Sequence, residues 1–144
     1  MKKSALYVPF LVLAACGDPT QSTIREIGNI GGSSIRRIDA PDTVRAGIEF
    51  AGAVYTWGSG SRDCNAPDGV TVVYGAQVAR VTPYVRFPKG EYVCTSDLRS
   101  YSHEFTARFD TPGEAAIRLV GFADFTSAGS RPLDSLQRRV VVVP

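Results

Sequence analysis

The sequence predicts an all-β domain, an antiparallel sandwich of about seven strands. Apolar residues recur at every second position in several short stretches, Gly and Pro separate these stretches, and none has the spacing of a long amphipathic helix. Hydrophobic residues make up 44% and charged residues 21% of the 144-residue chain, the balance of a folded domain. The length fits one domain after a short leader is set aside.

Residues 1–15 are expected to be a signal peptide. Lys2 and Lys3 supply positive charge, and the apolar run "ALYVPFLVLAA" that follows is too short to span about 30 Å of hydrocarbon as a permanent helix. Without these two lysines, the remaining 14 of the 16 basic residues balance 14 acidic ones. Because the basic residues are also scattered, we expect neither nucleic-acid binding nor a polybasic membrane patch.

The leader ends in Leu13-Ala14-Ala15-Cys16, which resembles the lipobox of bacterial lipoproteins. The resemblance implies that the leader is cut before Cys16 and that its thiol receives a diacylglyceryl group, which anchors the protein in a bacterial membrane. In some bacteria an Asp directly after the cysteine marks inner-membrane retention. Here Asp18 stands one position later, which favours the outer membrane, at its periplasmic face or at the cell surface. The alternative is an ordinary secretory leader that leaves Cys16 as a free thiol.

Assigning Cys16 to lipid leaves two cysteines, Cys64 and Cys94, which we expect to form a disulfide in an oxidising compartment. The chain-entropy model gives about 3 to 4 kcal/mol for a closed loop of roughly 30 residues. A metal site is disfavoured because two thiols and the distant His103 cannot complete a four-ligand shell. No Cys-x-x-Cys redox motif occurs.

Residues 16–34 are expected to be the lipidated N-terminus and a flexible tether, because "GDPTQSTIREIGNIGGSS" is rich in Gly, Ser, Thr, Asn and Pro and lacks sustained periodicity. If flexible, this stretch has a reach of about 24 Å. The sandwich is expected in residues 35–144. Its candidate strands are "EFAGAVYTW", "GVTVVYG", "QVARVTPYVRF", "FTARF", "AAIRL" and "RRVVVV", and the Pro112-Gly113 pair marks a turn.

The domain resembles the immunoglobulin-like domains of exported bacterial proteins. Their "P-x-x-V-x-x-G" connection is matched by Pro41, Val44 and Gly47, and their "F-x-x-P-G" edge is matched by Phe109, Pro112 and Gly113. Ala115 stands near the place of the usual tyrosine corner, and the single Trp57 ends the second strand instead of lying on a third. The resemblance implies a fold and no particular activity.

His103 is the only histidine, in phase with Tyr101, Phe105 and Phe109 on an expected inward face. Its neighbours Ser102 and Glu104 point the other way, so the local sequence builds no catalytic triad. We expect a hydrogen-bonded structural histidine, and an envelope enzyme that uses His103 is the alternative. A calcium site at Asp63 and Asp68 is conceivable, but turn chemistry explains the same residues. No cofactor and no metal are expected.

A long loop before the last strand, "GFADFTSAGSRPLDS", carries a possible binding surface composed of Phe122, Phe125, Arg131 and Leu133. Exposed aromatics beside Arg are typical of interaction hot spots, although Phe125 could equally cover the core. The Arg131-Pro132 pair resembles a feature of immunoglobulin-like inhibitors of cysteine proteases, whose other loop motifs are absent. Protease inhibition through the end loops is therefore a further alternative function. The sequence thus favours a non-enzymatic, lipid-anchored interaction or structural module of the cell envelope. Its partner, an envelope protein or surface ligand, is unidentified.

Overall fold

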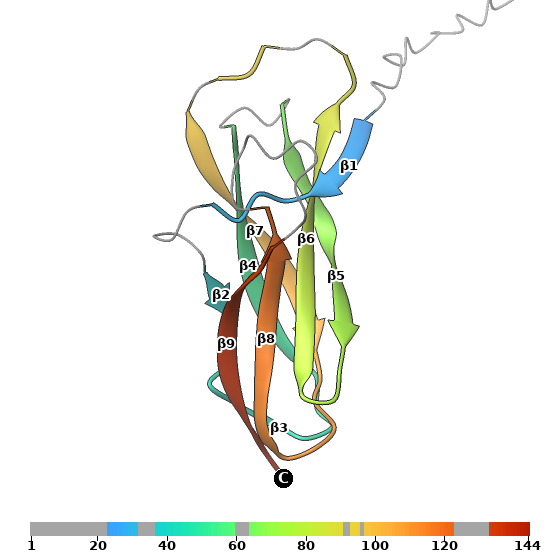
Figure 1. The fold of residues 1–144 in the computed structure, drawn as a ribbon, viewed down its shortest axis with the longest axis vertical. Coiled ribbons are helices and arrows are strands. Elements are labelled where there is room, and N and C mark those ends of the chain that lie inside the picture. Colours follow the sequence, from blue (N-terminus) through green and yellow to red (C-terminus); the bar gives the residue numbers. More distant parts are fainter. Residues whose placement is uncertain (1–22, 32–36, 60–63, 91–92, 96, 123–132) are drawn as a thin grey trace, which may run out of the picture.

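The computed structural model describes residues 23–31, 37–59, 64–90, 93–95, 97–122 and 133–144, and this part of the chain is all-β (Figure 1). It contains nine strands, where the sequence predicted about seven. They are β1 (Thr23–Ile27), β2 (Ile38–Asp39), β3 (Thr43–Arg45), β4 (Phe50–Ser59), β5 (Ala66–Tyr74), β6 (Val78–Pro88), β7 (Leu98–Ala107), β8 (Gly113–Gly121) and β9 (Leu133–Val143).

The strands form two sheets. The larger sheet has the order β1-β6-β8-β9-β3, with β5 also paired to β6, and the smaller sheet has the order β2-β4-β7. The smaller sheet is antiparallel, as predicted. The larger sheet is mixed, because β3 runs parallel to β9 and β6 runs parallel to β8. The prediction of a purely antiparallel architecture is therefore wrong for this sheet.

The parallel pairing of β6 with β8 follows from the path of the chain. After β6, the chain enters the smaller sheet as β7 and runs back along the molecule before it returns as β8 (Figure 1). Since β7 reverses the direction once in the opposite sheet, β8 runs in the same direction as β6. The alternation of polar and apolar residues sets which face of each strand is buried, but it does not set the neighbour with which a strand pairs.

The segment from Thr23 to Gly31 belongs to the folded body, although we predicted it to be part of a flexible tether. β1 pairs antiparallel with the end of β6, from Tyr84 to Pro88. Ile30 is fully buried, and its backbone N–H donates to the carbonyl of Phe122 at 2.8 Å. Backbone pairing and burial of one large apolar side chain fix a stretch whose composition resembles a linker. The other tether residues lie outside the described residues.

The core lies between the two sheets and follows the predicted period of two. Phe105, Ala107 and Phe109 are buried while the residues between them are exposed, which confirms the inward face predicted for this strand. Phe109 stacks on Phe50 at a centroid distance of 5.9 Å. From the larger sheet, Ile117 and other apolar side chains complete the core. No helix in the part of the chain that the structure describes has the length and apolar character needed to cross a membrane.

Candidate functional site

Cys64 and Cys94 lie together at the end of the sandwich that also carries β1. Cys64 precedes β5 and Cys94 precedes β7, their Cα atoms are 5.6 Å apart, and their sulfur atoms lie at disulfide distance. The expected pairing is thus present. It joins the β4–β5 connection to the β6–β7 connection, so it closes this end of the molecule instead of bridging the sheets through the core. We call this end, with β1 and the disulfide, the disulfide end.

The buried side-chain amide of Asn65 stabilises the disulfide end through hydrogen bonds to residues of β4 and β7. In the orientation that satisfies both of its polar atoms, Asn65 donates to the Ser59 carbonyl and to the Tyr101 hydroxyl, each at 3.2 Å, and accepts from the Ser59 N–H at 2.9 Å. The Tyr101 hydroxyl also donates to the Ser59 carbonyl. Gly58 is required here because a Cβ at this position would overlap the Asn65 amide. The network holds the first residues of β5 against β4 and β7, and sequence reasoning did not find it.

His103 lies inside the sandwich, 3% exposed, and its Nε2 is 2.8 Å from the Thr56 hydroxyl. Its Nδ1 has no hydrogen bond of normal geometry to any described residue. Burial lowers the pKa of His103, and the nearby backbone of Gly69 opposes part of this shift. We expected a structural histidine whose ring nitrogens are hydrogen-bonded. Nε2 fits this expectation, and Nδ1 does not. Among the described residues, no carboxylate is hydrogen-bonded to the ring, and no three His, Cys, Asp or Glu side chains gather into a metal-binding group.

The predicted binding loop falls only partly within the described residues. Phe122 is half-buried, and its backbone bridges to the N-terminal segment at Asn29 and Ile30. Leu133 begins β9, and its side chain is not among those described. Phe125 and Arg131 lie outside the described residues. Of the four predicted residues, only Phe122 has a side chain among the described residues.

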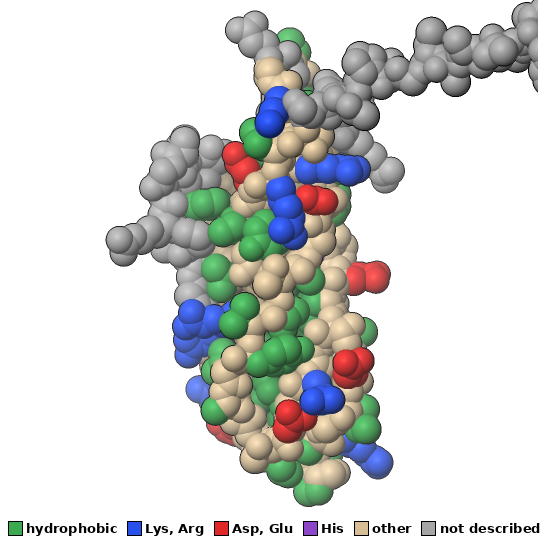
Figure 2. Space-filling view, turned by 90° about the vertical axis from the view of Figure 1, so that its right-hand side faces the viewer, with side chains coloured by type: hydrophobic (Ala, Val, Ile, Leu, Met, Phe, Trp, Pro, Cys, Tyr) green, Lys and Arg blue, Asp and Glu red, His purple; other side chains and the backbone are tan. Residues whose placement is uncertain are grey.

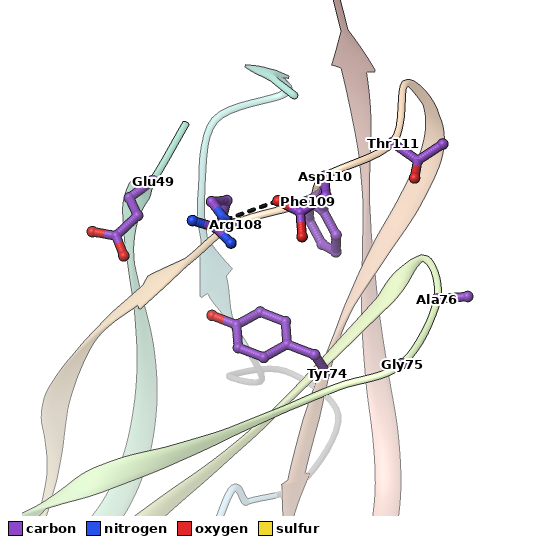
Figure 3. A pocket seen from close by; sticks show the side chains of 8 residues that line it. All are labelled: Glu49, Tyr74, Gly75, Ala76, Arg108, Phe109, Asp110 and Thr111. Carbon is purple, nitrogen blue, oxygen red and sulfur yellow. Dashed lines mark ion pairs between the residues drawn. The ribbon is translucent and has the colours of Figure 1, made fainter. Parts of the chain in front are cut away.

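An open depression of about 560 Å³ lies at the opposite end of the sandwich, which we call the distal end (Figure 3). Three connections line it: β3–β4 contributes Glu49, the β5–β6 turn follows Tyr74, and β7–β8 contributes Arg108. The Arg108 guanidinium forms an ion pair with Asp110 at 2.9 Å. Tyr74 is 53% exposed, and its hydroxyl donates to the Thr106 carbonyl at 3.4 Å. Sequence reasoning did not find this depression, because its residues come from three segments that are far apart in the chain.

The distal depression is open to solvent, and its charged groups of both signs lie beside an exposed aromatic ring. Such a surface can contact a protein side chain or a small polar group, and Tyr and Arg are the residue types that contribute most to interfaces. Comparison with family models, with curated proteins and with solved structures finds no match for this chain.

Proposed function

We propose that this chain is a lipid-anchored protein of the bacterial cell envelope whose body is a non-enzymatic interaction module. The observation that carries the proposal is the lipobox Leu13-Ala14-Ala15-Cys16, which ends only seven residues before β1. A thioether-linked lipid at Cys16 would therefore stand close in sequence to a strand of the folded body. One acyl chain gives marginal membrane binding, and two or more chains give stable anchoring.

An immunoglobulin-like sandwich is the proposed architecture of the body. Three observations support it. The strands form two sheets, the short strands β2 and β3 lie in different sheets, and β8 pairs antiparallel with β9. Gly47 and Gly113, both matched to the family's motifs, have positive φ angles of 75° and 131°, which residues with side chains rarely adopt. The parallel pairing of β6 with β8 departs from a purely antiparallel sandwich.

The distal depression is the proposed contact site for an envelope protein or a surface ligand. Its three connections converge at the end away from β1, so an anchor at Cys16 would leave this surface turned away from the lipid (Figure 1). His103 does not support an enzymatic function, because a side chain that is 3% exposed and packed inside the sandwich cannot reach a substrate without opening the fold. The interaction module is thus the function that the geometry supports best.

Metabolic labelling with a clickable palmitate analogue tests the anchor. Cells that produce the full chain should incorporate the label, and Cys16→Ala should abolish incorporation because no other side chain in the lipobox can form the thioether. Ser22→Ala, six positions further on, is the matched control and should be labelled like the unmodified protein. Equal labelling of Cys16→Ala would place the lipid elsewhere and overturn the proposal.

A further inference from the structure

The chain between the proposed anchor and the folded body is short, and this inference rests on the proposed lipidation of Cys16. Only residues 17–22 separate Cys16 from Thr23, the first residue of β1. Seven fully extended steps span at most about 25 Å, and a flexible chain of this length reaches about 15 Å on average. β1 itself is fixed by its pairing with the end of β6. The disulfide end must therefore lie near the membrane surface.

The disulfide end carries large apolar side chains that face solvent. Ile24 on β1 is 42% exposed, Leu98 at the start of β7 is 58% exposed, and Val93, directly before Cys94, is 99% exposed. They come from three segments that the disulfide, the Asn65 network and the β1–β6 pairing hold at one end of the molecule. Val93 lies in the connection between β6 and β7, next to the disulfide at Cys94.

The charges at the disulfide end suit a headgroup region. Arg86 and Lys89 are exposed near the end of β6, and Arg25 lies over the Tyr84 ring at 3.7 Å while pairing with Asp68. Figure 2 shows basic side chains together with acidic ones near this end. Long basic side chains and aromatic rings are the groups that lie at the interface between water and hydrocarbon, with apolar side chains beneath them.

We infer that the disulfide end docks on the phospholipid surface that holds the Cys16 anchor, with Val93, Leu98 and Ile24 in contact with the headgroup boundary. The acyl chains keep the body near the bilayer, and the exposed apolar side chains then set its orientation. β6 has 11 residues and, at about 3.3 Å per residue, spans roughly 35 Å. Docking would therefore hold the distal depression about that far from the membrane.

Lys89 supplies a specific readout, because it is the one lysine that follows the proposed cleavage site. Lipidated full-length protein is reconstituted on the outside of vesicles of phosphatidylethanolamine with a minor share of phosphatidylglycerol, and a membrane-impermeant amine reagent is added. The rate of Lys89 modification is followed by peptide mass spectrometry and compared with that of unlipidated Cys16→Ser protein free in solution. If nine in ten molecules are docked, Lys89 reacts about tenfold more slowly on vesicles, since protection follows the undocked fraction.

Matched variants separate docking from simple proximity to the membrane. Val93→Asp/Leu98→Asp should lose the protection of Lys89. Ile48→Asp/Val141→Asp makes the same change at two exposed apolar side chains of the distal end, 59% and 51% exposed, and should keep it. A lysine introduced at the exposed distal position by Thr111→Lys should react equally fast on vesicles and in solution.

The outcomes distinguish this inference from the proposed function. If intact mass confirms the lipid but Lys89 reacts equally fast in both settings, docking is wrong and the anchor stands. If Thr111→Lys is protected as well, the body lies flat or self-associates, which overturns the orientation. If protection occurs only in native membranes, a protein partner and not lipid covers the disulfide end. Protein purified without any acyl mass would instead remove the proposed function itself.

Discussion

Ile30→Ala tests the incorporation of the N-terminal segment into the folded body. Ile30 is fully buried, packs against Gly121 of β8 and belongs to the core. The substitution removes three carbon atoms, worth about 2.4 kcal/mol of transfer free energy at 0.8 kcal/mol each. The cavity left behind adds to this, so the free energy of unfolding should fall by about 3 to 4 kcal/mol.

Urea denaturation followed by circular dichroism measures this loss. The transition midpoint should fall while the denaturant slope stays unchanged, because the segment unfolds together with the sandwich. Ile24→Ala on the neighbouring β1 is the matched control: its side chain is 42% exposed, and we expect a change within about 0.5 kcal/mol. A loss below about 1 kcal/mol for Ile30→Ala would refute the burial of this segment and restore the tether interpretation.

Three further predictions concern the disulfide, the buried histidine and one glycine. The Cys64→Ala/Cys94→Ala variant should lose about 3 to 4 kcal/mol in urea denaturation on the chain-entropy argument for the 30-residue separation, and an unchanged midpoint would contradict it. Burial lowers the pKa of His103 in the folded state, so the neutral ring contributes its full stability above about pH 6.5. The free energy of unfolding should then decline as the pH falls from there toward the lower folded-state pKa. His103→Gln should flatten this pH dependence, and equal pH profiles for the variant and the unmodified protein would contradict the burial. Gly52→Ala should cost about 1 to 3 kcal/mol because its Cβ would overlap the Phe105 ring and the Asp39 carbonyl. Gly75→Ala should stay within about 0.5 kcal/mol, because its Cβ would make only an ordinary van der Waals contact, 3.8 Å from the Val78 carbonyl oxygen. Similar losses for both would contradict the close packing around Gly52.

The sequence predicted the interior of the sandwich well because alternation of apolar and polar residues is a local signal. Phe105, Ala107 and Phe109 could be assigned to one face from their spacing alone, and the structure buries all three. The pairing of Cys64 with Cys94 was likewise predictable, since assigning Cys16 to lipid left a single possible pair. These predictions needed no knowledge of which strands are neighbours.

Features that depend on pairing between distant segments could not be predicted. β1 has the burial pattern of an exposed edge strand, so "TIREI" shows no alternation, and only its pairing with β6 fixes it. The parallel β6–β8 pairing depends on β7 crossing to the other sheet. The distal depression joins Glu49 and Arg108, from two connections, to Tyr74 at the end of β5, and no local spacing relates them.

Intact-mass measurement of the protein, purified in detergent from the cells that make it, tests the central claim most directly. The account predicts a chain that begins at Cys16 and carries the added mass of a diacylglyceryl group, with or without a further acyl chain on its amino terminus. A chain that begins at another residue, or one that begins at Cys16 with no acyl mass, would contradict the account.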